Sequence, residues 1–283
     1  MSKTILVTGG AGFVGSHLCK RLVAEGHTVI SLDNYFTGSK DNHVSGVEYR
    51  DGHTKDIESL VPESPDLVYH LGEYSRVEQS LKEPAVVWDL NKVGTFAVLE
   101  FVRQRGSKIV YAGSSTKFGD GGMGRDQSPY AWAKATNTEL VQNYGSWYGI
   151  PFAVTYFYNV YGPGERAGVY GTVIEIFKQK RLRGEVLTVN APGTQKRNFT
   201  HVDDIVEGLV LVGEKGEGDS FGIGSEKSYT VLEVAEMFGG PIAMGPEVAG
   251  NRMGSDIDTT KTRLLGWECK NELPEYIRAF AGT

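Results

Sequence analysis

A tyrosine and a lysine four residues apart, Tyr130 and Lys134, are the residues of this sequence whose types and spacing could most directly do chemistry. A phenol titrates near pH 10, so it is a poor base at neutral pH without help. A lysine one helical turn away projects from the same face, and its charge can stabilise the phenolate. The pair could therefore move a proton at a carbinol, which is half of a hydride-transfer reaction. Alone, the pattern also fits a solvated lysine beside a packing tyrosine.

A nucleotide-binding pattern at the start of the chain favours the catalytic interpretation. Residues 4–8 are apolar and β-branched, which is typical of a buried strand. They run into a glycine-rich loop, residues 9–15, whose spacing matches the dinucleotide fingerprint. A helix predicted over 16–25 would point its N-terminal N–H groups and its dipole at a pyrophosphate.

An acidic residue ends the next predicted strand, 28–32. There Asp33 can accept hydrogen bonds from both hydroxyls of an adenosine ribose. Asn34 and Tyr35 follow it, and no arginine does, so a 2′-phosphate would meet an unpaired negative charge. The sequence therefore favours NAD over NADP. A tight turn without a ligand is the alternative, but strand, loop, helix, strand and acid in this order are typical of a dinucleotide site.

The composition sets outer limits on the function. The chain has 283 residues, of which 40% are hydrophobic, so it can bury a sizeable core. Its net charge of −6 and lack of a dominant basic run argue against binding to nucleic acid or to a membrane surface. Cys19 and Cys269 lack the spacing of a metal site and suit a reducing cytoplasm. We expect no signal peptide, no membrane-spanning segment and no metal.

Strands and helices alternate as far as about residue 160. Strands are predicted over 66–71, 108–112 and 152–157, and helices over 85–105 and 128–148. This order predicts an α/β fold of the Rossmann type, a doubly wound parallel sheet with ligands at the carboxyl ends of the strands. We predict an NAD-binding domain over 1–164. Residues 165–283 should form mostly a smaller, mixed substrate-binding region, with an interleaved boundary.

The sequence resembles the extended short-chain dehydrogenases/reductases of the NAD-dependent nucleotide-sugar epimerase/dehydratase kind over nearly its whole length. The segments that give the resemblance are 8–15, 32–34, 70–71, 91–95, 113–115, 130–134, 159–163, 201–204, 258–261 and 265–267. The resemblance implies that Tyr130 removes the sugar hydroxyl proton and that Lys134 stabilises the phenolate and binds the nicotinamide ribose. Ser114, five residues before Gly119, would bond the reacting oxygen, although such hydroxyls are often only capping groups.

The resemblance also implies the ligands and the residues that bind them. The cofactor would be NAD, held by Gly9, Gly12, Phe13, Val14, Gly15, Asp33, Asn34, Asp56, Ile57, Leu71, Gly72, Asn91, Tyr130, Lys134 and Tyr156. The substrate would be a nucleotide-diphosphate sugar, held by Ser115, Thr116, Asn159, Thr172, Val173, Arg197 and Arg252. Arginines suit the two phosphates because they bind oxyanions in a bidentate manner. Either arginine could instead be a surface residue, and Asn91 could be a buried amide satisfied by backbone.

The reaction type is indicated by the two residues after Ser114. Related 4,6-dehydratases carry an Asp-Glu pair there, whereas this chain has Ser115 and Thr116, which cannot act as carboxylate acids or bases. We therefore expect a UDP-hexose 4-epimerase that works through a transient 4-keto sugar. The alternatives are a nucleotide-sugar dehydratase, a reductase, an epimerase acting at another carbon, or a catalytically idle NAD-binding scaffold.

Several residues depart from the family pattern. Gly72 and Glu73 occupy the place of two small residues, and Glu73 would put a carboxylate near the pyrophosphate unless it turns away. Ser75 stands where some epimerases have a lysine that contacts the cofactor, and Arg76 beside it could compensate. Tyr156 replaces a common arginine. The family also implies a homodimer, formed through the two predicted helices 85–105 and 128–148.

Overall fold

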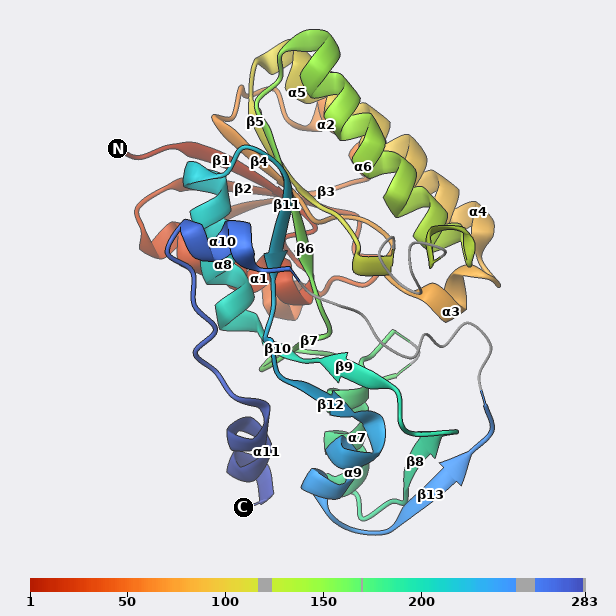
Figure 1. The fold of residues 1–283 in the computed structure, drawn as a ribbon. Coiled ribbons are helices and arrows are strands. Elements are labelled where there is room, and N and C mark those ends of the chain that lie inside the picture. Colours follow the sequence, from red (N-terminus) through yellow and green to blue (C-terminus); the bar gives the residue numbers. More distant parts are fainter. Residues whose placement is uncertain (117–123, 169, 248–257, 282–283) are drawn as a thin grey trace.

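A seven-stranded parallel sheet lies at the centre of the computed structural model, which describes residues 1–116, 124–168, 170–247 and 258–281 (Figure 1). The strand order is β11-β6-β5-β4-β1-β2-β3, and every pairing is parallel. The strands are β1 Thr4–Thr8, β2 Thr28–Asp33, β3 Val47–Asp51, β4 Leu67–His70, β5 Lys108–Ala112, β6 Phe152–Phe157 and β11 Gly218–Ile223. The doubly wound α/β fold is thus confirmed. The order reverses between β1 and β4, and ligands of such sheets bind at the carboxyl ends of strands beside this point.

Helices cover both faces of the sheet (Figure 1). One face packs against α1 Phe13–Ala24 and α8 Val202–Lys215, with α10 Thr260–Leu264 beside α8. The other face packs against α2 Ile57–Leu60, α5 Gly94–Arg105 and α6 Pro129–Tyr148. Successive side chains of a strand point to opposite faces, so Ile5 and Val7 belong to the first core and Leu6 to the second. Burial on both faces explains why β1 reads as a continuous apolar run.

The predicted helix over 85–105 is divided into three parts. It comprises α4 Pro84–Val87, a π-helical segment Trp88–Val93 and α5, and the short helix α3 Val77–Ser80 precedes it. The wide π-helical turn contains Asn91, whose buried amide accepts a hydrogen bond from the Tyr74 N–H at 2.7 Å. π-helical turns of this kind are frequent near functional sites. Two 3-10 turns, Lys40–Asn42 and Thr54–Asp56, lie in earlier loops.

The second half of the chain builds a smaller region and also returns to the main sheet. Three two-stranded sheets pair β10 Thr200–His201 with β7 Val160–Tyr161, β12 Ser228–Thr230 with β9 Lys196–Asn198, and β13 Ile242–Gly245 with β8 Leu187–Asn190. With them lie α7 Val173–Leu182, α9 Val231–Phe238 and α11 Leu273–Ala281. This region has its own core, which includes Phe177 and Phe238. Between its parts, α8 and β11 cross back to the seven-stranded sheet.

Candidate active site

The loop between β1 and α1 is shaped for a phosphate group. Gly9 has φ of +77°, in the left-handed region that side chains disfavour. A Cβ on Gly15 would lie 2.1 Å from the carbonyl oxygen of Gly9, so the loop and the helix could not approach this closely with any other residue there. Helix α1 follows Gly12, and no described side chain caps its first N–H groups. These groups are therefore available to an anion.

Asp33 ends β2 beside this loop. Its carboxylate accepts hydrogen bonds from the Ala11 N–H at 2.9 Å and the Tyr35 N–H at 2.8 Å. Burial raises the pKa of Asp33, and these two N–H groups oppose the increase. The bonds fix both oxygens, and each oxygen keeps a lone pair for a further donor. This geometry fits the recognition of two ribose hydroxyls.

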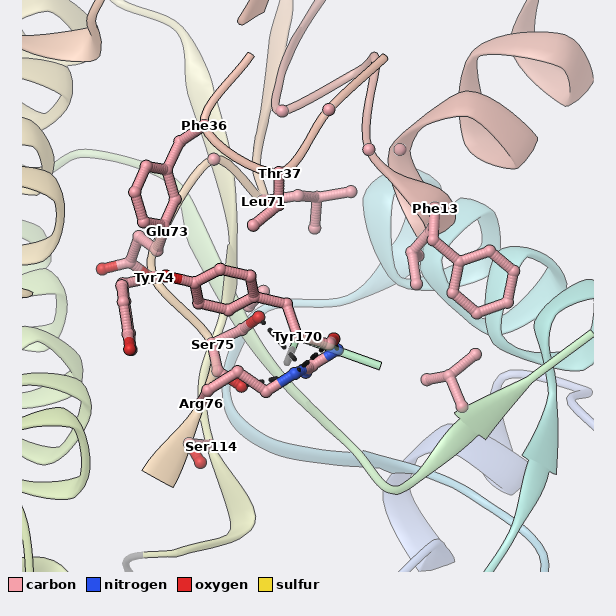
Figure 2. Close-up of a pocket in the computed structure, with 18 of the residues that line it drawn as sticks. Phe13, Phe36, Thr37, Leu71, Glu73, Tyr74, Ser75, Arg76, Ser114 and Tyr170 are labelled. Carbon is pink, nitrogen blue, oxygen red and sulfur yellow. Dashed lines mark hydrogen bonds between the residues drawn. The ribbon is translucent and has the colours of Figure 1, made fainter. Parts of the chain in front are cut away.

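A cavity of about 380 Å³ extends from the glycine loop past Asp33 to Tyr130. Figure 2 shows part of its wall, with Phe13, Leu71 and Ser114 among the residues drawn. Its wall contains many of the residues that the sequence predicts, namely Gly9, Gly12, Phe13, Val14, Gly15, Asp33, Asn34, Leu71, Gly72, Ser114, Ser115, Thr116, Tyr130, Lys134, Asn159 and Thr172. They come from the carboxyl ends of β1, β2, β4, β5 and β6, from the first turn of α1, from α6 and from the loop before α7. The fold thus gathers them at the edge where a doubly wound sheet binds its ligand.

Tyr130 is held on the first turn of α6. The Ser128 hydroxyl caps this helix by accepting the Ala131 N–H at 3.1 Å, and proline occupies a first-turn position where no N–H is needed. The Tyr130 hydroxyl donates to Ser114 Oγ at 3.2 Å, and Ser114 Oγ lies 2.9 Å from Thr116 Oγ1. All three side chains are buried. Their hydroxyls could converge on one carbinol oxygen.

Lys134, one turn further along α6, is paired with a carboxylate. Its Nζ donates to Glu73 Oε2 and to the Ala112 carbonyl, and it lies 4.7 Å from the centre of the Tyr111 ring. The two charged side chains are only 6% and 2% exposed. Glu73 therefore turns away from the pyrophosphate region and into the protein. A pair this deeply buried is costly to form and costly to break on one side.

Known proteins that resemble this chain show its family. The model of the NAD dependent epimerase/dehydratase family matches residues 5–224. The chain belongs to this family. It is 32% identical to UDP-glucuronic acid decarboxylase 6 of Arabidopsis thaliana, over 96% of this chain and 85% of that protein. It is 30% identical to a putative UDP-glucose 4-epimerase of Methanocaldococcus jannaschii, over 97% of this chain and 96% of that protein.

A solved structure resembles the whole fold. The UDP-glucose 4-epimerase of Thermotoga maritima, determined with UDP-glucose, has a TM-score of 0.92 and 28% sequence identity. The match covers 99% of this chain and 97% of that one. Because the family is NAD-dependent, NAD is the cofactor of this epimerase/dehydratase family member. The glycine loop, the uncapped start of α1 and the Asp33 carboxylate fit its pyrophosphate and ribose.

Glu73 lies at the centre of a buried hydrogen-bond network in this family member. Besides Lys134, it accepts bonds from Thr95 Oγ1 at 2.7 Å, Asn137 Nδ2 at 2.9 Å and Tyr111 OH at 3.2 Å. Burial raises its pKa, but the attraction of Lys134 and the hydrogen bonds from Lys134 and Thr95 more than offset that and lower the pKa below its usual value. Glu73 is a residue whose position the sequence motifs did not predict. The only sequence signal was a carboxylate where the family has a small residue.

The network continues to the strand that carries the glycine loop. Because Thr95 donates its hydroxyl proton to Glu73, it accepts from His70 Nε2, 3.0 Å away. His70 Nδ1 is then free to accept from Thr8 Oγ1 at 2.7 Å, and Thr8 in turn accepts the Gly72 N–H. Burial lowers the pKa of His70 to about 4, so the ring is neutral at pH 7. Lys134 and β1 are thus connected through one set of buried bonds.

Some predicted residues lie away from this cavity. Ile57 is buried in the core, and Asp56 precedes it in a 3-10 turn. Asn91 bonds both backbone groups of Tyr74, which is the alternative that the sequence left open for it. Tyr156 donates its hydroxyl to Asp219 Oδ1 at 2.7 Å. None of the four lines the cavity.

The predicted substrate residues divide between two cavities. Val173 and Arg197 line a second cavity of about 440 Å³, together with Asn159 and Thr172, which line both. Arg252 lies outside the described residues. Within the described part of the chain, no cluster of three or more candidate metal ligands occurs, and no helix is long and apolar enough to cross a membrane.

Replacing Asp33 by asparagine should lower NAD affinity by roughly 10- to 100-fold, because charge-assisted hydrogen bonds to the ribose are lost. The preference for NAD over NADP should shrink, since the negative charge that opposes a 2′-phosphate disappears. Calorimetric titration with both dinucleotides measures the two effects. Asp51→Asn is the matched control, because Asp51 pairs with Asp33 in the register of β2 and β3 but is exposed. Equal losses in both variants would contradict the assignment.

Proposed function

We propose that this protein is an NAD-dependent UDP-hexose 4-epimerase. The observation that supports this best is the contact of the Tyr130 hydroxyl with Ser114 Oγ at 3.2 Å, at the end of the cavity that begins at the glycine loop. Tyr130 would take the proton of the C4 hydroxyl while the C4–H bond breaks, and Ser114 would hold the oxygen as it becomes a ketone. Bound NAD supplies a two-electron acceptor that takes the hydride and returns it.

Epimerisation then requires only that the 4-keto sugar rotate in the cavity so that it presents the opposite face of C4. Tyr130 would then give its proton back to the oxygen as C4 is reduced from its other face. Atoms and electrons balance without an external reductant, because the same hydride and proton leave and return. Ser115 and Thr116, both buried beside Ser114, are hydroxyl residues, whereas elimination would need a carboxylate pair there. This supports epimerisation over 4,6-dehydration.

Decarboxylation of a UDP-hexuronate is the second candidate, favoured by the 32% identity to a UDP-glucuronic acid decarboxylase. Oxidation at C4 of a hexuronate yields a β-keto acid, which loses carbon dioxide more readily than its parent. The same first step, with Tyr130 as base, would serve both reactions. The two candidates therefore differ in the fate of the ketone and not in the residues that form it.

A product assay with purified protein, NAD and a panel of UDP-, dTDP-, CDP- and GDP-hexoses plus UDP-glucuronate tests the proposal. A C4 epimer detected by NMR without net NADH would support it and identify the nucleotide. A 4-keto-6-deoxy sugar would indicate a dehydratase, and a UDP-pentose with carbon dioxide a decarboxylase. No turnover on any sugar, with NAD demonstrably bound, would shift the interpretation to an idle NAD-binding scaffold.

We also propose that the protein forms a homodimer through the helices on one side of the sheet. Large apolar side chains are exposed there, among them Trp88 at 55%, Phe96 at 52% and Trp132 at 40%. Trp88 and Trp132 stack with their ring centres 6.1 Å apart, which joins α6 to the segment before α5. Exposed apolar surface of this kind commonly marks a protein interface. A cytoplasmic location stays a prediction, consistent with the free thiols of Cys19 and Cys269.

Replacing Phe96 by aspartate should convert the dimer into a monomer, because a carboxylate would be desolvated in the interface. Sedimentation velocity over a range of concentrations measures the change. Leu264→Asp is the matched control, since Leu264 is 80% exposed on α10, away from α5 and α6. A wild-type protein that sediments only as a monomer would remove the proposal, and so would an unchanged dimer in Phe96→Asp.

A further inference from the structure

Arg76 lies where the two cavities meet. It follows β4 and directly precedes α3, and it lines both the cavity that contains Tyr130 and the cavity that contains Arg197. Under the proposed function, the first cavity takes the nicotinamide and the reacting hexose, and the second takes the nucleotide. Arg76 therefore places a positive charge in the wall of the cavity that would hold the hexose.

Backbone carbonyls hold the guanidinium in place. Its Nε donates to the Tyr170 carbonyl at 2.6 Å, its Nη2 donates to the same oxygen, and its Nη1 donates to the Ser75 carbonyl at 3.1 Å. Figure 2 shows the guanidinium between Ser75 and Tyr170, with Ser114 lower in the same view. These bonds occupy some of the five N–H donors of the guanidinium and leave the others for a ligand. The arginine is therefore oriented in advance.

The carbonyls supply no counter-charge. Among the described residues no carboxylate forms an ion pair with Arg76, and Glu165 acts on it only at longer range. Burial lowers the pKa of Arg76, and the negative charge of Glu165, which lies beyond ion-pair distance, opposes this only in part. A bound anion would stabilise an arginine in this environment. The planar guanidinium matches a carboxylate, with which it can form two parallel hydrogen bonds.

Glu165 offers a complementary group in the same wall. Its Oε1 accepts the Thr172 N–H at 3.1 Å and the Thr172 hydroxyl, whereas its buried Oε2 has no hydrogen-bond partner among the described residues. Glu165 lines the same cavity as Arg76. Burial raises the pKa of Glu165 to about 7, and the charge of Arg76 opposes this increase. A hydroxyl-bearing ligand could satisfy this oxygen.

We propose that Arg76 binds a carboxylate carried by the hexose itself, so that the substrate is a nucleotide-linked hexuronate, and that Glu165 binds one of its ring hydroxyls. The inference rests on the proposed function and narrows its substrate class. The hexose end is favoured over the diphosphate because Arg76 shares its cavity with Tyr130 and is near enough to interact electrostatically with it. In a hexuronate the carboxyl carbon is attached to C5, next to the reacting C4. A neutral hexose would leave the guanidinium with only the more distant Glu165 carboxylate as a counter-charge.

Calorimetric titration of the NAD-loaded protein with UDP-glucuronate, UDP-glucose and UDP tests this inference. Wild-type protein should bind UDP-glucuronate more tightly than UDP-glucose. Arg76→Gln should lower the affinity for UDP-glucuronate by roughly 10- to 100-fold, because a charge-assisted bidentate contact is lost. The affinities for UDP-glucose and UDP should change by less than about 3-fold. Arg183→Gln is the control, because Arg183 is an exposed arginine that pairs with Glu185 and lines neither cavity.

Two results would overturn the inference. One is a wild-type protein without preference for the hexuronate. The other is an equal loss for all three ligands in Arg76→Gln, which would assign Arg76 to the diphosphate. NAD affinity and the melting temperature verify that the variant folds, and Arg76→Lys replaces it if it does not, with an intermediate loss expected. Failure of every nucleotide sugar to bind NAD-loaded wild-type protein would count against the proposed function instead.

Discussion

Turnover should fall by about 10²- to 10⁴-fold when Tyr130 is replaced by phenylalanine, because the variant lacks the group that moves the substrate proton. The ring should keep its place, since it packs in an apolar cluster with Val87, Leu90 and Ala133. NAD affinity should therefore change little. Conversion of the nucleotide sugar that the product assay identifies, followed by NMR at saturating substrate, measures the loss, and calorimetry measures NAD binding.

Tyr144→Phe is the matched control for this experiment. Tyr144 lies on the same helix, and its hydroxyl donates to Glu100 at 2.7 Å, away from the cavity. This variant should turn over at close to the wild-type rate. Full activity in Tyr130→Phe would show that another group accepts the proton. Loss of NAD binding in that variant would show instead that the substitution disturbs the cofactor site.

Much of the fold could be predicted because its central strands are buried on both faces. β1, β5 and β6 read as short apolar runs, and the structure has them at 4–8, 108–112 and 152–157 as predicted. β3, Val47–Asp51, was missed because it is an edge strand with alternating charged side chains and no fully buried residue. β11, Gly218–Ile223, was missed because it begins with glycine and aspartate and its partner β6 is distant in sequence.

The sequence predicted those parts of the site whose residues lie close together along the chain. The glycine loop, Asp33 and the pair on α6 depend on spacings within one turn, strand or helix, and the structure gathers them in one cavity. The function of Glu73 depends instead on Thr95, Tyr111, Lys134 and Asn137, which come from three other elements. No local sequence pattern indicates contacts between residues from such distant segments. The departure from a small residue was visible, but its meaning required the folded positions of its partners.

Replacing Glu73 by glutamine should lower the free energy of unfolding by about 3 to 5 kcal/mol, the usual cost of removing one partner of a buried ion pair. The Lys134 ammonium would remain buried without its counter-charge, and the new amide N–H groups would face donors instead of acceptors. Urea unfolding at pH 7 measures the loss. An exposed pair, Arg183 with Glu185, provides the control, because Glu185→Gln should change stability by less than about 1 kcal/mol.

The effect should depend on pH with a definite sign. Burial raises the pKa of Glu73, but Lys134 and the hydrogen bonds bring it below the unfolded value of 4.5. The stability from this carboxylate is therefore complete above pH 4.5 and is lost as the pH falls through the lower folded value. The gap between wild type and Glu73→Gln should narrow over that range, because a protonated glutamate resembles glutamine. A gap that stays constant down to pH 3 would contradict the ionised pair.

A double-mutant cycle separates the pair from its surroundings. Lys134→Met alone leaves the Glu73 carboxylate buried without its partner, whereas the double variant with Glu73→Gln has no buried charge at this position. The double variant should be more stable than the sum of the single losses predicts, by about 1 to 3 kcal/mol. Additive losses would mean that Glu73 acts through Thr95 and Asn137 rather than through Lys134. Because the cycle measures unfolding, it assigns the pair without reference to activity, which every Lys134 variant should lose for a separate reason.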